Sequence, residues 1–361
     1  MSSPPPNSPP PGVPEQQPQW PTPPGAAAPR ESRGVSFFVA VFLGILLLVS
    51  AGLNVLLLLL SVGSIATGLE GSANYDEVHV AGARDSGKRV LQVGIRGAIA
   101  EGANPLLGAA GGTVTQVKRA LKYALDQNVD GLLLYIDSPG GGVTDSDRIY
   151  TMLRRFRADH PGIPVAALYG DMAASGGYYI AVAAEHIISR RTSISGSIGV
   201  IMSSWNFAEM AKKYGVEQIA IKSARTPYKD MLSPTRALSE GERSMLTSIV
   251  DELYDQFVSV VMSGRSMDRA AVERVANGGI YTAQQSLASG LVDEIGDYQT
   301  ALAWFKKRLG GEVAIVEQRR RAGLGDLLLG MRGGSAPTSA VESLLGSSTG
   351  PRFLYFWQGG R

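Results

Sequence analysis

Between residues 89 and 170 the chain alternates between short apolar runs and longer amphipathic runs. The short runs are rich in valine, leucine and isoleucine, as buried strands are, and the longer runs repeat apolar residues every three or four positions, as helices do. Strands that alternate with helices favour parallel pairing through right-handed crossovers, so the pattern predicts an α/β fold. The predicted strands are 89–99, 131–137 and 164–170, and the predicted helices are 113–127, capped by Thr113, and 145–160.

The pattern changes towards the C-terminus. An apolar stripe predicts one long helix over 239–263, and a further helical unit runs to about Leu309. Residues 311–361 are rich in glycine and serine and are interrupted by GLGDLLLGM and PRFLYFW, neither of which is long enough to span a bilayer. The sequence leaves open whether this extension contacts a partner subunit or a membrane, or is loosely packed.

Residues 37–62 form an apolar run without a charged side chain. A helix over 37–60 would be about 36 Å long at ~1.5 Å per residue, which exceeds the ~30 Å hydrocarbon core of a bilayer. A cleavable signal peptide has a shorter apolar region that begins nearer the terminus, so the run predicts an uncleaved transmembrane anchor. Arg30 and Arg33 precede it and acidic residues follow it, which predicts a cytoplasmic N-terminus and an extracytoplasmic chain from about residue 66 onward.

Composition sets further limits. Residues 1–34 are dominated by proline and cannot build a packed core, so we expect a disordered or polyproline II tail in the cytoplasm. The 361 residues include 34 basic and 32 acidic side chains without a long basic run, which argues against a nucleic-acid partner. The chain has no cysteine and its three histidines are widely spaced, so we expect no disulfide framework, no metal site and no cofactor.

The stretch GARDSGK at 82–88 fits the first seven positions of a phosphate-binding loop. Arg89 stands where serine or threonine should hold magnesium. The stretch also leads into a predicted strand, whereas a phosphate-binding loop must open a helix. We therefore interpret the match as chance.

Ser175 lies in DMAASGGYYIA, among alanines and glycines, between a predicted strand and a predicted helix. Small neighbours suit close helix packing, and they equally suit a hydroxyl that a substrate must approach. A nucleophilic serine needs a base, and His186 lies in an apparent strand without an obvious orienting acid. A lysine can serve if burial lowers its pKa from about 10.4 by roughly 3 to 5 units, but spacing alone does not select one lysine.

The run SPGGG at 138–142 follows another predicted strand. Glycine lets a carbonyl approach backbone N–H groups closely, so Gly140, Gly141 and Gly176 are candidate donors to the oxyanion of an acyl-transfer reaction. The alternative is a tight strand-to-helix turn. The pattern alone does not separate these two interpretations.

Five stretches occur in order along the chain: DSPGGGV, DMAASGGYYIA, SISGSIGVI, YKDMLSP and GGIYTAQQSLASGLVDEIG. Together they resemble the signal peptide peptidase A family, also called protease IV, of the short bacterial type. The resemblance covers about residues 88–310. It implies a Clp protease/crotonase-like fold of repeated ββα units over 66–310, preceded by the single transmembrane helix at 37–62.

The resemblance also implies a serine–lysine dyad. By their positions in the family's motifs, the nucleophile is Ser175 and the general base is Lys229 of the YKD motif, while Lys222 matches a non-catalytic position. The stretch KSARTPYKD is two residues longer than the family's usual form, which leaves 54 positions between Ser175 and Lys229. A loop absorbs two residues at small cost, so Lys229 remains the expected base.

The resemblance implies an oxyanion hole and an assembly as well. The family's oxyanion glycine falls at Gly140 or Gly141, with Gly176 as the second donor by analogy with related folds, and Ser197 is a further polar group expected near the lysine. Short members form dome-shaped homo-oligomers in which serine and lysine come from neighbouring protomers. A soluble monomer of this chain should then be inactive.

The function implied by the resemblance is that of a membrane-anchored serine endopeptidase without a cofactor. Its expected substrates are short apolar peptides, such as the signal-peptide remnants left after protein export. Two other classes stay open at the level of sequence. A non-catalytic membrane scaffold would keep the fold alone, and a crotonase-like acyl-CoA enzyme would share the oxyanion geometry, although no acid/base glutamate is evident beside the glycines.

Overall fold

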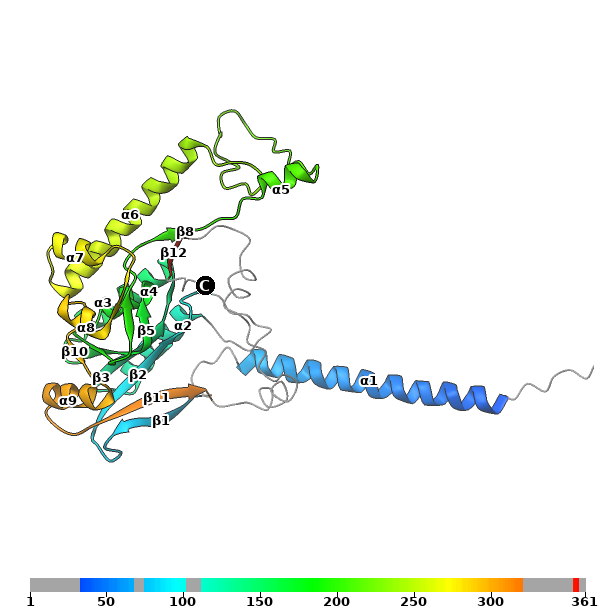
Figure 1. Ribbon diagram of the computed structural model, residues 1–361. Helices are drawn as coiled ribbons and strands as arrows, with labels where there is room; N and C mark the ends of the chain where they lie inside the picture. Colours follow the sequence, from blue (N-terminus) through cyan, green and yellow to red (C-terminus); the bar gives the residue numbers. More distant parts are fainter. Residues whose placement is uncertain (1–32, 68–74, 102–111, 321–352, 357–361) are drawn as a thin grey trace, which may run out of the picture. The chain divides into compact units, whose positions relative to one another are not determined.

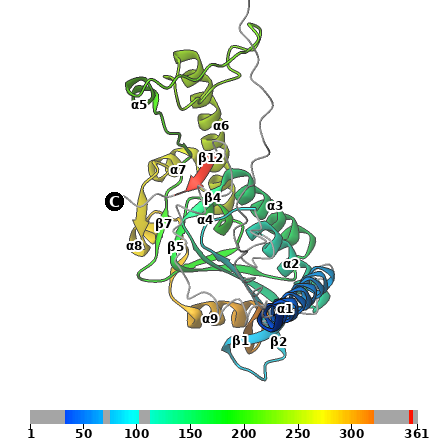
Figure 2. The ribbon, with the colours of Figure 1, turned by 90° about the vertical axis from the view of Figure 1, so that its right-hand side faces the viewer.

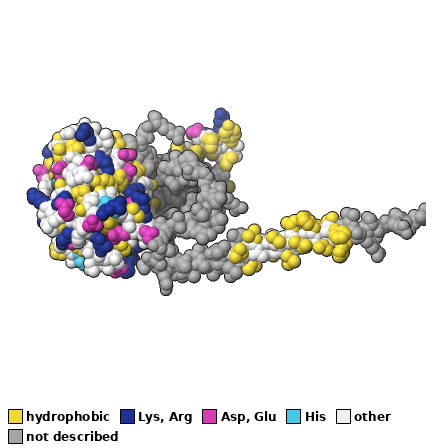
Figure 3. All heavy atoms as spheres, turned by 90° about the horizontal axis from the view of Figure 1, so that it is seen from below, with side chains coloured by type: hydrophobic (Ala, Val, Ile, Leu, Met, Phe, Trp, Pro, Cys, Tyr) yellow, Lys and Arg dark blue, Asp and Glu magenta, His cyan; other side chains and the backbone are white. Residues whose placement is uncertain are grey.

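The computed structural model describes residues 33–67, 75–101, 112–320 and 353–356. The chain divides into two compact units, Met1–Ala73 and Asn74–Arg361. In the first unit, helix α1 (Arg33–Thr67) contains the one span among the described residues that is long and apolar enough to cross a membrane, Phe37–Leu56, with a mean hydropathy of 2.5. The hydrophobic side chains of Phe37–Leu56 are exposed (Figure 3). The predicted tail lies almost entirely outside the described residues.

The second unit is built on one large sheet with a parallel centre (Figures 1 and 2). In its described part the strand order is β1-β11-β2-β3-β5-β6-β10, and β1–β11 is the one antiparallel pair on this path. Parallel neighbours need crossover connections, which is why helices separate most of these strands in the sequence. The strands are β1 (Tyr75–Gly82), β2 (Lys88–Arg96), β3 (Gly131–Ser138), β5 (Val165–Ala174), β6 (His186–Ser189), β10 (Glu294–Ile295) and β11 (Val313–Arg320).

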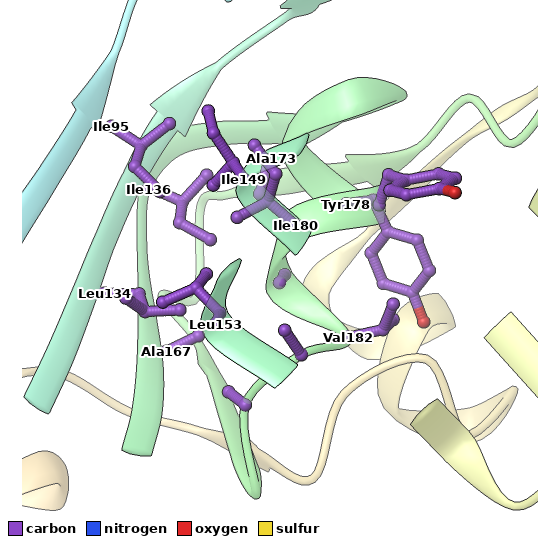
Figure 4. Close-up of a cluster of buried hydrophobic side chains, with 14 of the residues drawn as sticks. Ile95, Leu134, Ile136, Ile149, Leu153, Ala167, Ala173, Tyr178, Ile180 and Val182 are labelled. Atoms are coloured by element: carbon purple, nitrogen blue, oxygen red, sulfur yellow. The ribbon is translucent and has the colours of Figure 1, made fainter. Parts of the chain in front are cut away.

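Helices cover both faces of this sheet because its strands are apolar on both faces. Along β3, Leu132 and Leu134 belong to one buried cluster and Leu133 belongs to another, as the period of two in a strand requires. Part of the first cluster is drawn in Figure 4. The helices that contribute to the first cluster are α2 (Thr113–Asp126), α3 (Val143–Asp159), α4 (Gly176–Ala181), α6 (Glu240–Arg265) and, through Val272, α7 (Arg269–Val275), and the helix of the second is α9 (Tyr298–Leu309).

Short strands surround the region where β3 and β5 end. β7 (Ile194–Gly196) runs parallel to the last residues of β5 and antiparallel to β9 (Ile280–Thr282). A separate three-stranded sheet has the order β4-β12-β8, and both of its pairs are antiparallel. Its strands are β4 (Gly140–Gly142), β8 (Ile201–Met202) and β12 (Phe353–Phe356).

Between β8 and α6 the chain leaves the sheet, and we refer to residues 203–238 as the projecting segment (Figure 1). It contains the short helix α5 (Ala208–Lys213), none of whose residues is buried. α6 then begins with a capping box, in which the Ser239 hydroxyl accepts from the Glu242 N–H and the Glu242 carboxylate accepts from the Ser239 N–H. Two short helices follow it, α7 (Arg269–Val275) and α8 (Ala283–Ala288).

The α/β fold class predicted from the sequence is confirmed, and each predicted strand and helix corresponds to an observed one with small shifts at the ends. The predicted ββα order recurs at β3, β4 and α3. Thr113 is not the helix cap, because Gly112 holds that position and Thr113 is the first helical residue. The stretch 82–88 connects β1 directly to β2, which confirms the reason for rejecting a phosphate-binding loop.

The C-terminal region departs most from expectation. β11 lies beyond residue 310, where the sequence places the end of the catalytic domain, and it pairs with β1 on one side and β2 on the other. Within PRFLYFW, Phe353–Phe356 is a strand paired on both sides, so these four residues are not loosely packed. The stretch GLGDLLLGM lies outside the described residues.

Candidate active site

Ser175 lies at the sharp turn between β5 and α4, and its backbone is strained. Its φ of 52° and ψ of −117° fall in a region that non-glycine residues rarely adopt, at a typical cost of about 1–3 kcal/mol. The neighbouring structure enforces this geometry, because Ala174 pairs with Gly196 and the Ser175 N–H donates to the Gly196 carbonyl at 2.7 Å. Strain of this kind recurs at functional sites, so the turn is the first candidate for chemistry.

The small residues after Ser175 allow α4 to begin directly against β3 and α3. A Cβ on Gly176 would overlap the Ser146 hydroxyl, and a Cβ on Gly177 would lie 2.9 Å from the Ser138 carbonyl. The next two residues fix the helix, because both tyrosines are fully buried and hydrogen-bonded. The Tyr178 hydroxyl donates to the Leu291 carbonyl at 3.0 Å, and that of Tyr179 donates to the Asp147 carboxylate at 2.8 Å.

The three glycines whose N–H groups were predicted to bind an oxyanion lie together beside this turn. A Cβ placed on Gly140, whose φ is +99°, would lie 2.7 Å from the Gly176 amide nitrogen. A Cβ placed on Gly176 would lie 3.2 Å from the Gly141 amide nitrogen. The structure therefore brings Gly140, Gly141 and Gly176 into one cradle at the start of α4.

Hydrogen bonds distinguish Gly140 from Gly141, the two glycines of SPGGG between which the sequence did not choose. The Gly140 N–H donates to the Ser138 hydroxyl at 3.1 Å, so it is already engaged. The Gly140 carbonyl and the Gly142 N–H bond to Ile99, and because backbone groups alternate in direction along a strand, those of Gly141 face β12. The Gly141 N–H is thus directed towards β12, whereas the Gly140 N–H is directed back at Ser138.

Ser197 lies near Ser175 through the backbone. It follows Gly196, the residue that accepts the Ser175 N–H, and it is also buried with a positive φ of 49°. Its own N–H donates to the Gly279 carbonyl at 2.6 Å. Ser175 and Ser197 are therefore held by one set of backbone hydrogen bonds at the ends of β5 and β7.

Lys229 is not brought to Ser175 within the single chain. It lies in the projecting segment with its side chain exposed. In the part of the chain that the structure describes, this side chain makes no hydrogen bond or ion pair, and no contact joins it to Ser175. The burial that a neutral lysine requires is therefore not supplied by this chain alone.

Lys222, the rival base, is occupied by other partners. Its ammonium group donates to the Pro227 carbonyl at 2.7 Å and forms an ion pair with Asp230. Asp230 also accepts a hydrogen bond from Arg236, with 3.1 Å between Nε and Oδ2. Arg236 in turn donates a hydrogen bond to Glu242 at 2.9 Å. We refer to Lys222, Asp230, Arg236 and Glu242 as the ion cluster. It ties the residue after Lys229 to the first turn of α6.

The ion cluster holds its carboxylates in the charged form. Hydrogen bonds from Arg236, then from Lys222, hold the pKa of Asp230 well below its usual range. Hydrogen bonds from Arg236 and from the Ser239 backbone lower the pKa of Glu242 to about 2. The sequence analysis missed this cluster, although Ser239 and Glu242 have the spacing of a capping box and could have indicated the start of α6.

His186 lies towards the opposite end of β5 from Ser175. It is in register with Ala166, nine positions before Ser175, which is about 30 Å at ~3.3 Å per strand residue. Its ring stacks on Trp304, and 3.3 Å separates its Nε2 from Glu294 Oε2. His186 is therefore excluded as the base for Ser175 within one chain. Among the described residues there is also no group of three or more metal-ligating side chains.

Comparison with known proteins points to peptidases. The model of Peptidase family S49 matches residues 157–311. A relative from Synechocystis sp. (strain PCC 6803), named as a protease, is 41% identical over 217 residues, which cover 60% of this chain and 73% of the relative. A relative from Enterococcus faecium, named as a signal peptide peptidase, SppA, is 34% identical over 290 residues, which cover 76% of this chain and 82% of the relative.

Among solved structures, the chain is similar to a mutant of the membrane-bound stomatin-specific protease 1510-N. The sequence identity is 17%, and the match covers 60% of this chain and 84% of the solved chain, with a TM-score of 0.39. A mutant of ClpP1 from Listeria monocytogenes matches at 16% identity and a TM-score of 0.37, covering 57% of this chain and 91% of that one.

Proposed function

The chain belongs to the signal peptide peptidase A family, peptidase family S49, and from that premise we propose that it is a membrane-anchored endopeptidase whose nucleophile is Ser175. The relatives support a serine protease. The observation that carries the choice of Ser175 is its strained turn beside the glycine cradle, because a serine peptidase needs its nucleophilic hydroxyl next to amides that can bind an oxyanion.

The reaction follows from this geometry. The Ser175 hydroxyl adds to the carbonyl carbon of the peptide while its proton passes to a neutral lysine. The N–H groups of Gly141 and Gly176 stabilise the oxyanion, and collapse breaks the C–N bond as the lysine returns the proton to the leaving amine. Water then adds to the ester carbon of the acyl-enzyme while the lysine again accepts a proton. The C–O bond to Ser175 breaks, the lysine returns this proton to the Ser175 oxygen, and the carboxylic acid product leaves.

We assign the role of base to Lys229 of a second copy of the chain. Lys222 is paired with Asp230, whereas the Lys229 side chain is exposed, and the projecting segment around it carries large exposed hydrophobic side chains. Burial of this surface against another protomer would remove the ammonium group from water, which is what a neutral lysine requires. The hydrophobic side chains include Trp205, Met210, Tyr214, Ile219 and Ile221, of which Ile221 is 98% exposed.

The proposed substrates are short apolar peptides at the membrane surface, such as signal-peptide remnants. The predicted anchor at 37–62 would hold the enzyme where such remnants remain after export. The basic residues before the anchor favour a cytoplasmic N-terminus, so the catalytic unit would act outside the cytoplasm. A site built on a serine and on amides needs no cofactor.

The test uses the full chain purified in detergent. We would measure labelling by a fluorophosphonate probe, hydrolysis of an apolar fluorogenic peptide and oligomeric state. The wild type should be labelled and active, and Ser175→Ala should be unlabelled and inactive. Lys229→Ala should lose at least about 10³-fold in kcat without a change of oligomeric state. Lys222→Ala, which removes one contact of the ion cluster but not the proposed base, should lose less than about 10-fold.

Other results would replace the proposal by a named alternative. An active Lys229→Ala with an inactive Lys222→Ala would assign the base to Lys222. Activity in a strictly monomeric preparation would show that one protomer supplies both groups. A wild type that is neither labelled nor active on any peptide would favour the membrane scaffold, and turnover of acyl-CoA without dependence on Ser175 would favour the crotonase-like enzyme.

A further inference from the structure

The last two residues of β3, Asp137 and Ser138, direct their side chains to opposite faces of the sheet. Ile136 belongs to the first buried cluster and Tyr135 packs against the second. The period of two in a strand therefore places Ser138 on the face that α4 covers and Asp137 on the face that α9 covers. Each of the two side chains forms hydrogen bonds to a different backbone segment.

The Ser138 side chain fixes the direction of the Gly140 backbone. Ser138 is fully buried, and its hydroxyl donates to the Gly97 carbonyl at 2.6 Å. Because a hydroxyl has one proton, the same oxygen can only accept from the Gly140 N–H, at 3.1 Å. The Gly140 carbonyl is held as well, since it accepts from the Ile99 N–H at 2.9 Å. A trans peptide bond is planar, so this carbonyl directs the Gly141 N–H the opposite way.

The Asp137 side chain holds a bulge in β5. Residues 170–172 of β5 lie opposite the single residue Asp137, so the register of the two strands shifts at this point. The N–H groups of Asp171 and Met172 both donate to Oδ1 of Asp137, each at 3.2 Å. Ser175 lies three positions after Met172. The carboxylate therefore fixes the strand immediately before the residue proposed as the nucleophile.

β5 changes its neighbour at this bulge. Before it, residues 166–168 pair with β6, and after it, residues 172–174 pair with β7. A bulge bends a strand and redirects the side chains that follow, which is what such a change of partner requires. Gly170 gives the carboxylate room, because a Cβ at this position would lie 2.8 Å from the Asp137 Cγ.

We propose that Asp137 and Ser138 are positioning residues of the active site. Ser138 directs the Gly141 amide towards the oxyanion through Gly140, and Asp137 sets the register in which β5 presents Ser175. Neither side chain touches the substrate. The inference rests on the proposed function for its effect on catalysis, whereas the hold of the two side chains on the backbone can be measured without any reaction.

Hydrogen exchange at single amides of the full chain in detergent tests this hold. In Asp137→Ala the amides of residues 171 and 172 should exchange about 10-fold faster, and in Ser138→Ala the amide of Gly140 should do the same. Asp137→Asn keeps an accepting oxygen and should stay near the wild type. Ser189→Ala is the matched control, because it removes another buried hydroxyl that donates to a backbone carbonyl, and it should change none of these amides.

The kinetic test compares the rate of labelling by a fluorophosphonate probe with its final extent. Ser138→Ala and Asp137→Ala should lower the labelling rate, and kcat on the fluorogenic peptide, by about 10²-fold with KM within about threefold. The final extent counts folded sites and should equal that of the wild type, whereas a merely structural role would lower it. Asp137→Asn should restore kcat per labelled site to within about threefold of the wild type.

The two measurements can fail separately. Unchanged exchange in both alanine variants would overturn the proposal even if the wild type is an active peptidase. Faster exchange with the labelling rate and kcat per labelled site of the wild type would overturn it too, because the two side chains would then hold the backbone without positioning the site. If the wild type is neither labelled nor active, faster exchange would still support the hold, and only the proposed function would fail.

Discussion

The two halves of the proposed active site are held in different ways. Ser175 is 1% exposed, and its backbone is fixed by β5, β7 and α4, all of which belong to the buried centre of the second unit. Lys229 is exposed on the projecting segment, outside the sheet. The proposed nucleophile and the proposed oxyanion donors therefore lie together within one chain, whereas the proposed base lies in an exposed position.

The exposure of Lys229 does not mean that its backbone is loose. The adjacent Asp230 is bonded to Arg236, and Arg236 is bonded to Glu242 in the first turn of α6. The ion cluster thus fixes the position of the lysine while leaving its side chain without a partner in the described chain. This difference supports the proposal that Lys229 acts on a second copy of the chain.

The largest expected effect comes from removing Ser175 in one copy of the chain and Lys229 in another. Ser175→Ala and Lys229→Ala should each lose at least about 10³-fold in activity. Co-expression of the two variants should restore about a quarter of the wild-type activity, because one in four interfaces would pair an intact serine with an intact lysine across a heterologous contact. Activity is measured on purified mixed oligomers. Mixed oligomers without activity would show that both groups act within one protomer.

An intermediate loss of activity is expected from a substitution in the glycine cradle beside Ser175. Gly140→Ala places a methyl group into the space of the Tyr355 carbonyl at a positive φ, so a substrate carbonyl could no longer approach the Gly141 and Gly176 amides. We expect kcat to fall about 10²- to 10³-fold with the oligomeric state unchanged. Gly162→Ala, on an open surface turn, is the matched control and should retain full activity. An active Gly140→Ala would remove the cradle from the mechanism.

The smallest expected effect is a pH dependence of the local stability of the projecting segment, which carries the proposed base Lys229. The pKa values of Asp230 and Glu242 are lowered in the folded chain, so their stabilising contribution is complete above the usual carboxyl range of about 4 and is lost as the pH falls towards 2. Hydrogen exchange, corrected for intrinsic rates, should show constant protection of the projecting segment from pH 7 to about 4.5 and loss of protection below. Glu242→Gln should weaken this protection already at pH 7, and a loss centred near pH 6 would contradict the assignment.

The fold, and the tight turn at which Ser175 lies, were predictable because their signals are local. Apolar runs of strand length and helical stripes fixed the order of the central elements, and the crowding of Ser175 by small residues indicated the tight turn at which it lies. The helix cap was misplaced by one residue, since glycine at 112 leaves no side-chain signal to distinguish it from Thr113. Motif order also identified the glycines, although only the hydrogen bond from Gly140 to Ser138 separated it from Gly141.

The pairing of β12 and the ion cluster could not be predicted because they depend on contacts between distant residues. The run FLYF has the aromatic composition of a strand, but composition does not identify β4 and β8 as its neighbours. Arg236 likewise resembles any exposed arginine until Asp230 and Glu242 are seen on both sides of it. The proposed pairing of Lys229 with a second copy could not be derived from contacts, because the described part of a single chain does not bring Lys229 to Ser175.

The position of β11 has a consequence for the order in which the protein is made. β11 lies between β1 and β2, so two of the first strands to be synthesised are held apart by the last strand of the large sheet. The sheet cannot close until residues 313–320 have left the ribosome and reached the same side of the membrane. During that interval β1 and β2 present unpaired edges, so a chain arrested before residue 313 should be a target for chaperones and quality-control proteases.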